Sequence, residues 1–150
     1  MCLSGCIPVP PTAKMYPGPQ LDKNIESTII TTTAARTWDE LRIRIILVDG
    51  KSALNFFKAM YYGNATEVKV APGKHDIRLS YSAGFQYIGD FWLVTCPGKT
   101  YIAKADAEYG VKMWIEDAET GKKVGGVKGS ADEPKTKDVP CNLGEKKQPL

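Results

Sequence analysis

The fold class is decided by one stretch, Leu41-Arg42-Ile43-Arg44-Ile45-Ile46-Leu47-Val48-Asp49-Gly50, at residues 41–50. Apolar and charged residues alternate from 41 to 45, which is the period of a strand with one buried face. The Asp-Gly pair at its end predicts a tight turn, because glycine tolerates positive φ and aspartate is favoured beside it. Residues 75–81 alternate in the same way. Both segments therefore predict half-buried strands.

Short segments rich in β-branched and aromatic residues follow one another along the rest of the chain. Further strands are predicted at 25–33, 67–70, 91–95, 100–105, 111–116 and 122–127. Turn-forming residues separate them, as in Ala71-Pro72-Gly73-Lys74 and Pro97-Gly98. This pattern predicts an all-β fold, a single antiparallel β-sandwich (Ig-like or transthyretin-like) of about seven or eight strands over residues 25–128. Residues 52–62 fit either a helix or a strand and turn, and both stay open.

Two flanking segments differ from this body. Residues 7–24 hold five prolines, which favour extended chain over helix or central strand, and we expect a tether there. Residues 129–150 are polar and poor in apolar side chains, which predicts a polar tail.

Composition and charge exclude some classes of function. The chain has 150 residues, 43% hydrophobic and 25% charged, which is ordinary for one globular domain. No apolar run approaches the ~18 residues of a membrane-spanning helix. The formal net charge is +3, and basic residues are interspersed with acids rather than clustered on one face. We therefore expect no nucleic-acid partner.

The first six residues hold a lipoprotein signature. Leu3-Ser4-Gly5-Cys6 has the form of a bacterial lipobox, in which small residues precede a cysteine that is acylated after cleavage. This predicts lipidation of Cys6 and makes residues 1–6 the remnant of a signal. Only two residues precede Leu3, whereas a secretory signal has an apolar region of ~7–15 residues. We therefore expect that translation starts further upstream or that the signal has been lost.

The remaining cysteines predict a disulfide. If Cys6 carries lipid and Cys2 leaves with the signal, Cys96 and Cys141 remain. A pair of cysteines in an oxidising compartment predicts one bridge, which would hold the polar tail. Zinc is disfavoured because the chain has no CxxC spacing and His75 is its sole histidine. We expect no metal and no cofactor.

Catalytic chemistry has few candidates. His75 follows a turn and begins an alternating strand, which favours a strand-edge position over a catalytic base. Two groups of acids could supply paired carboxylates of a hydrolase: Asp106 with Glu108, and Glu116 with Asp117 and Glu119. Acids near turns are usually solvated, so we expect no catalytic residues.

Clustered aromatic residues give a binding hypothesis. Phe85, Tyr87 and Trp92 could contact a ligand or partner, since aromatic faces stack on sugars and anchor protein interfaces. The alternative, that alternating aromatics fill the sandwich core, is favoured, and Trp114 is expected in that core as well.

Five motifs in order carry a resemblance. They are Tyr16-Pro17-Gly18-Pro19, Val48-Asp49-Gly50-Lys51, Ala71-Pro72-Gly73-Lys74-His75, Pro97-Gly98-Lys99-Thr100-Tyr101 and Trp114-Ile115-Glu116-Asp117. The chain resembles a family of small, mostly uncharacterised proteobacterial lipoproteins. Its half from the VDG to the PGKH turn is similar to PEGA-type β-sandwich repeats. The resemblance implies export, lipidation and a β-sandwich body, with no catalytic residues to transfer. It also implies sorting to the outer membrane, because Ile7 rather than aspartate follows the lipidated cysteine.

The sequence therefore predicts an outer-membrane-anchored lipoprotein that acts as a non-catalytic binding or structural module of the bacterial envelope. Its partners would be the membrane, through Cys6, and an envelope protein or glycan. Two alternatives stay open: a periplasmic hydrolase that uses the acids near Asp117, and an immunity or accessory protein that binds a protein partner.

Overall fold

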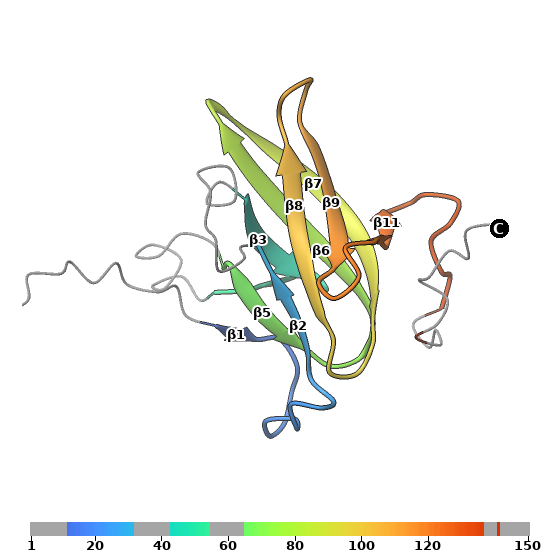
Figure 1. Cartoon of the computed structure of the whole chain (residues 1–150). Coiled ribbons are helices and arrows are strands. Elements are labelled where there is room, and N and C mark those ends of the chain that lie inside the picture. The colour runs from blue at the N-terminus through green and yellow to red at the C-terminus, as the bar shows by residue number, and fades with distance from the viewer. Residues whose placement is uncertain (1–11, 32–42, 55–64, 137–140, 142–150) are drawn as a thin grey trace, which may run out of the picture.

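The computed structural model describes residues 12–31, 43–54, 65–136 and 141, and its strands form two facing sheets (Figure 1). In chain order the strands are β1 (Ala13–Lys14), β2 (Ser27–Ile30), β3 (Ile43–Val48), β4 (Lys51–Ser52), β5 (Glu67–Val70), β6 (Gly73–Ala83), β7 (Phe85–Thr95), β8 (Thr100–Asp106), β9 (Lys112–Asp117), β10 (Lys123–Val124) and β11 (Gly126–Val127). Sheet A has the order β1-β5-β2-β8-β9-β10, and sheet B has the order β11-β7-β6-β3-β4. The predicted all-β sandwich is confirmed.

Two strand pairs differ from the antiparallel prediction. β1 runs parallel to β5, and β2 runs parallel to β8, whereas the other ladders are antiparallel. The β2–β8 pair is joined by a long connection through β3–β7 and not by a hairpin, which is what a parallel pair requires. Among the described residues, seven strands have four residues or more, which fits the predicted number.

The core lies between the two sheets and follows the alternation of β3 and β6. Ile43 and Ile45 point inward. A register shift between Ile45 and Leu47 then changes which alternate residues of the strand face the core. This bulge returns Val48 to the core, where it pairs with Ile77. The largest fully buried apolar side chains from the two sheets are Tyr81, Ile29, Ile43, Ile45, Ile77, Leu79, Leu93, Ile115, Val48, Val68 and Val70.

The predicted Asp49-Gly50 turn joins β3 to β4. Both residues have positive φ, 51° and 75°, as in the tight turns that match the twist of a hairpin. Most of the segment left open between helix and strand, residues 55–62, lies outside the described residues.

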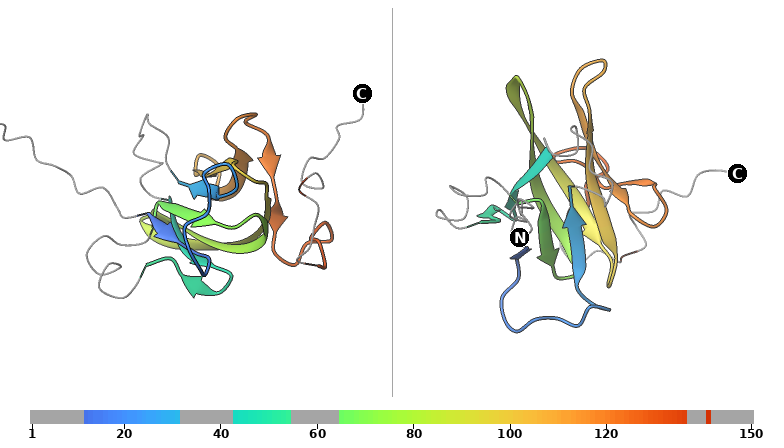
Figure 2. Two further views of the ribbon diagram at one scale, coloured as in Figure 1. Left: turned by 90° about the horizontal axis from the view of Figure 1, so that it is seen from below. Right: turned by 60° about the vertical axis from the view of Figure 1, so that its left-hand side comes forward.

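Two hairpins project from one end of the sandwich, β6–β7 from sheet B and β8–β9 from sheet A. The right-hand view of Figure 2 shows both extending in the same direction. We call this end of the molecule the hairpin end. The connection between β7 and β8, at Pro97-Gly98, lies at the opposite end.

The segment expected as a tether packs on the body where it is described. Ala13 is buried and pairs with Val68 of β5. Tyr16 is also buried, and its hydroxyl donates to the Glu26 carboxylate and accepts from the Leu21 N–H at 2.9 Å. The domain therefore begins before residue 25, because an aromatic side chain fastens the proline-rich segment to sheet A. Residues 7–11 lie outside the described part of the chain.

The last predicted strand, 122–127, is two strands in different sheets. β10 pairs with β9 in sheet A, and β11 pairs with β7 in sheet B. Gly125 lies between them with φ 69°, and a Cβ there would lie 2.3 Å from the Trp92 carbonyl oxygen. Only glycine fits this crossing between sheets.

The polar tail is held against sheet B over its described part. The Lys128 N–H donates to the Asp90 carbonyl at 2.9 Å, and Lys74 forms an ion pair with Glu133. The predicted disulfide between Cys96 and Cys141 is present, with a Cα–Cα distance of 5.2 Å. Main-chain pairing and an ion pair thus add to the cross-link that the sequence predicted.

Candidate functional site

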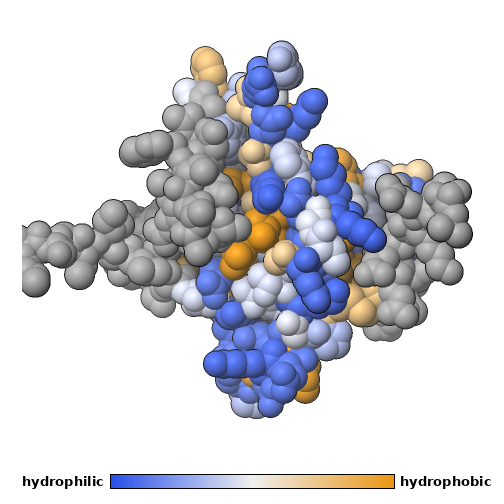
Figure 3. Space-filling view, viewed as in Figure 1, coloured by the Kyte–Doolittle hydropathy of each residue, from blue (hydrophilic) through white to orange (hydrophobic). Residues whose placement is uncertain are grey.

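The end of the β6–β7 hairpin exposes three large apolar side chains. Phe85 is 78% exposed, Ile88 57% and Tyr87 41%, and we call these three residues the aromatic tip. Figure 3 shows apolar side chains at this end of the molecule, above a mixed and largely hydrophilic face. Exposed apolar residues gathered at one place, rather than scattered singly, mark interaction surfaces.

Phe85 and Tyr87 lie on the inward face of β7 and are exposed because their hairpin extends past the core, whereas Ile88 lies on the outer face. Tyr81 pairs with Tyr87, and Gly89 is the next inward position of β7. A Cβ at Gly89 would lie 2.9 Å from the terminal methyl of Met113 on β9, so the sheets are in close contact at this level. Phe85 is closer than Gly89 to the end of the hairpin. Its side chain is on the same inward face of β7, but at a level beyond the contact between the two sheets.

No charged side chain lies near the aromatic tip on its own hairpin. Residues 79–89 contain no Asp, Glu, Lys or Arg. The second hairpin differs, since its exposed Tyr109 (83%) lies next to Glu108, whose N–H donates to the Asp106 carboxylate. The uncharged surface is therefore a property of the β6–β7 hairpin alone.

The structure separates the three aromatics that the sequence singled out. Phe85 and Tyr87 belong to the aromatic tip and do not fill the core, contrary to the favoured interpretation. Trp92 is 6% exposed, and its Nε1–H donates to Ser130 Oγ at 3.1 Å, so the tail covers it. Sequence reasoning missed Ile88 and Tyr109, although the lack of charge in residues 79–89 was a readable signal.

Trp114 also differs from its prediction. Its neighbour Ile115 points into the core, so Trp114 lies on the outer face of sheet A. Its Nε1–H donates to Glu116 at 2.6 Å, and the Lys123 ammonium lies 4.6 Å from the ring centroid. These polar contacts explain how a tryptophan is accommodated outside the core.

The acids considered for hydrolysis hold a turn. Asp117 is buried and accepts hydrogen bonds from the N–H groups of Glu119 and Thr120 and from Lys99 Nζ at 3.1 Å. Burial raises the pKa of Asp117, but these hydrogen bonds and the nearby ammonium outweigh it, and the pKa is lowered. A general acid requires the opposite shift. Glu119 is 81% exposed and lines an open hollow together with Lys99 and Asp117.

His75 lies between two oxygen acceptors. Its Nδ1 is 2.8 Å from Asp49 Oδ2, and its Nε2 is 2.7 Å from the Ala71 carbonyl oxygen. The Asp49 carboxylate also accepts the Asp76 N–H, so these contacts fasten the β3–β4 turn to β6. His75 lies near the start of β6, as predicted, but β6 is an interior strand of sheet B and the side chain is 12% exposed, so it does not lie at the edge of the sheet.

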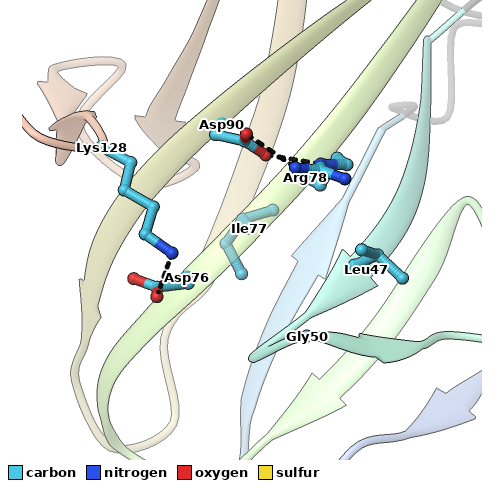
Figure 4. A pocket seen from close by; sticks show the side chains of 7 residues that line it. All are labelled: Leu47, Gly50, Asp76, Ile77, Arg78, Asp90 and Lys128. Atoms are coloured by element: carbon cyan, nitrogen blue, oxygen red, sulfur yellow. Dashed lines mark hydrogen bonds and ion pairs between the residues drawn. The ribbon is translucent and has the colours of Figure 1, made fainter.

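A shallow hollow on the outer face of sheet B is lined by two ion pairs (Figure 4). The Arg78 guanidinium donates to both carboxylate oxygens of Asp90, at 2.7 and 2.9 Å, and lowers the pKa of that carboxyl. Lys128 pairs with Asp76 at 2.8 Å. These four charges neutralise one another, which leaves little net field to attract a charged ligand.

Cys6, the predicted lipidation site, lies outside the described residues. Within the described ranges, no group of three or more His, Cys, Asp or Glu side chains is placed to hold a metal ion. The described part of the chain also has no helix of a length and hydrophobicity that would cross a membrane. Comparisons with family models, curated proteins and solved structures find no match to this chain.

Proposed function

We propose that the protein is an outer-membrane-anchored lipoprotein of the bacterial envelope that acts as a non-catalytic binding or structural module. The observation that carries the proposal is the aromatic tip, Phe85, Tyr87 and Ile88, exposed on the β6–β7 hairpin. A soluble domain gains nothing for its own stability from such exposed residues, whereas an interaction surface requires them.

The disulfide supports the cellular compartment. Bridges such as Cys96–Cys141 persist in secreted, periplasmic and surface proteins and are rare in the reducing cytosol. The lipobox that ends at Cys6 agrees with export, because acylated cysteines of this kind form at the envelope.

The described polar groups support a non-catalytic role. Asp117 has its hydrogen bonds committed to a turn, and His75 joins two strands. Both are thus used to build the sandwich. The exposed residues that gather at the hairpin end of sheet B are apolar, which favours binding over chemistry.

The test is acylation of the chain in a bacterial host, behind a complete signal sequence. We expect wild type to incorporate labelled palmitate and to fractionate with outer membranes. Cys6→Ser should lose the label and become soluble, whereas Cys2→Ser, the matched control, should keep the label because Cys2 leaves with the signal. A Cys6→Ser protein that stays in the membrane, with no label on wild type, would contradict the proposal.

A further inference from the structure

The β6–β7 hairpin ends in a surface whose chemistry suits the headgroup layer of a bilayer. Residues 79–89 carry no charge, and Phe85 and Ile88 are more than half exposed. Charged side chains are what make insertion of most surface loops costly. Phenyl and phenol rings are favoured at the boundary between acyl chains and headgroups, where the turn's backbone stays within reach of water.

The chain length before the described residues allows the bilayer to reach this end of the molecule. Ala13 is level with Tyr101, because both lie in one row of paired residues across sheet A, with Val68 and Ile29 between them. From that row β8 runs five residues further (101 to 106) toward the hairpin end, about 17 Å at ~3.3 Å per residue. Seven residues separate Cys6 from Ala13 and span up to about 24 Å. An acyl group on Cys6 can therefore lie level with the hairpin end.

We propose that the aromatic tip inserts into the surface of the same bilayer that holds the acyl chains of Cys6, with Phe85, at the end of the hairpin, as the inserted side chain. This rests on the proposed lipid anchor. The two contacts together would fix the orientation of the sandwich on the membrane, with the hairpin end toward the lipid. Acyl chains on Cys6, at the end of an extended segment, give no such orientation by themselves.

The charge of the hairpin end identifies the lipid class. The β6–β7 hairpin brings no basic residue to the surface in residues 79–89, and the end of the neighbouring hairpin carries two acids, Asp106 and Glu108, and one base, Lys112, which pairs with Asp106 across the ladder. These three charges leave a small net negative charge, so the hairpin end offers anionic headgroups no net attraction. The surface therefore suits zwitterionic headgroups, and binding should depend little on ionic strength.

The experiment uses the full chain with Cys6→Ser, so that no acyl chain contributes, and vesicles of phosphatidylethanolamine and phosphatidylcholine. Co-flotation gives the partition coefficient. We expect weak binding that is unchanged between 0.1 M and 0.5 M salt. Phe85→Ser should lower the partition coefficient about tenfold, as expected for removing one inserted phenyl ring from lipid contact.

The matched control is Ile25→Ser. Ile25 is 47% exposed, and its carbonyl accepts the Gly98 N–H at the end of the molecule opposite the hairpins. This variant removes a comparable exposed apolar side chain and should leave the partition coefficient unchanged. Phe85→Trp should keep or strengthen binding, and its added fluorescence should be quenched by lipids labelled near the headgroup. Circular dichroism spectra that match wild type establish that each variant is folded.

Three results would overturn the proposal: no co-flotation of the Cys6→Ser chain, an equal loss in Ile25→Ser, or binding that salt abolishes. A fourth result would also overturn it: the Cys6→Ser chain oligomerises in sedimentation experiments, Phe85→Ser abolishes the oligomer, and vesicles bind neither variant. The tip would then be an interface between copies of the chain. The palmitate label on Cys6 is measured separately, so failure of the anchor and failure of the tip are distinguishable.

Discussion

Within β7, residues 85–88 are exposed and residues 91–95 are buried, although β6 pairs with both halves of the strand. The difference comes from what covers the strand on its other sides. Next to the second half, β11 pairs at Phe91 and Trp92, and the tail covers the outward side chain of Trp92. Beside the first half, no strand among the described residues takes the place of β11.

The comparison shows that an alternating pattern defines a strand and its faces, and that later parts of the chain decide which of these faces are buried. Phe85, Tyr87, Phe91 and Leu93 all lie on one face of β7. Only the last two reach the core. The exposed half is then available for contact with another surface.

The largest effect is expected from removing the cross-link that holds the tail over the second half. The Cys96–Cys141 bridge closes a loop with a sequence separation of 45. In the chain-entropy model this loop stabilises the fold by about 4 kcal/mol. Reduction should lower the thermal midpoint by roughly 10 °C and make residues after Gly129 sensitive to protease.

The control is Cys141→Ser, which should melt at the midpoint of reduced wild type and should not respond to reductant. Differential scanning calorimetry and limited trypsin digestion measure the two effects. A tail that stays protected without the bridge would show that Lys74–Glu133 and Trp92–Ser130 contacts suffice to hold it.

The second test compares one residue from each half of β7. Leu93 is fully buried, so Leu93→Ala should lower the free energy of unfolding by about 3 kcal/mol through lost burial and a residual cavity. Ile88 is 57% exposed, and Ile88→Ala should change the free energy of unfolding by less than about 0.5 kcal/mol. Urea unfolding measures both. Similar losses of unfolding free energy in the two variants would contradict the division of β7 into an exposed and a buried half.

The sequence predicted the strands and the disulfide better than the surface. Alternation at residues 41–45 and 75–81 located β3 and β6, and counting the cysteines paired Cys96 with Cys141. The positions of Trp92 and Trp114 could not be read in this way. Period-2 spacing gives the same pattern whichever face is covered, and coverage depends on the tail and on the sheet switch at Gly125.

The third test displaces β11 from β7. Gly125→Ala adds strain at positive φ and places a Cβ against the Trp92 carbonyl, and it should cost about 2 kcal/mol or more. Gly121 has a similar φ of 67° with open space around it, so Gly121→Ala should cost about 1 kcal/mol. Chemical denaturation gives the difference. Equal costs would mean that the crossing between sheets adjusts without disturbing Trp92.

The smallest effect tests a buried acid against an exposed one at the end of β9. The native pKa of Asp117 lies below the ordinary value of 3.8, which the unfolded chain retains. The carboxylate therefore stabilises the fold fully above about pH 4, and this contribution is lost as the pH falls through the lower native value. Asp117→Asn should cost about 1 kcal/mol at pH 7, because the amide oxygen keeps the hydrogen bonds of the turn while the charge opposite Lys99 is lost.

The difference between Asp117→Asn and wild type should narrow between pH 5 and about pH 2, as wild type becomes protonated and the variant does not titrate. Glu119→Gln is the control, since Glu119 is 81% exposed and lies 3.7 Å from the same ammonium, and an exposed pair contributes little. Urea unfolding at each pH measures the effect. A cost close to zero at every pH would show that Asp117 acts through its hydrogen bonds to Glu119 and Thr120, which the amide keeps, and not through its charge. In that case any hydrogen-bond acceptor of the same shape could replace the acid, and the ion pair with Lys99 would contribute nothing to the stability of the turn.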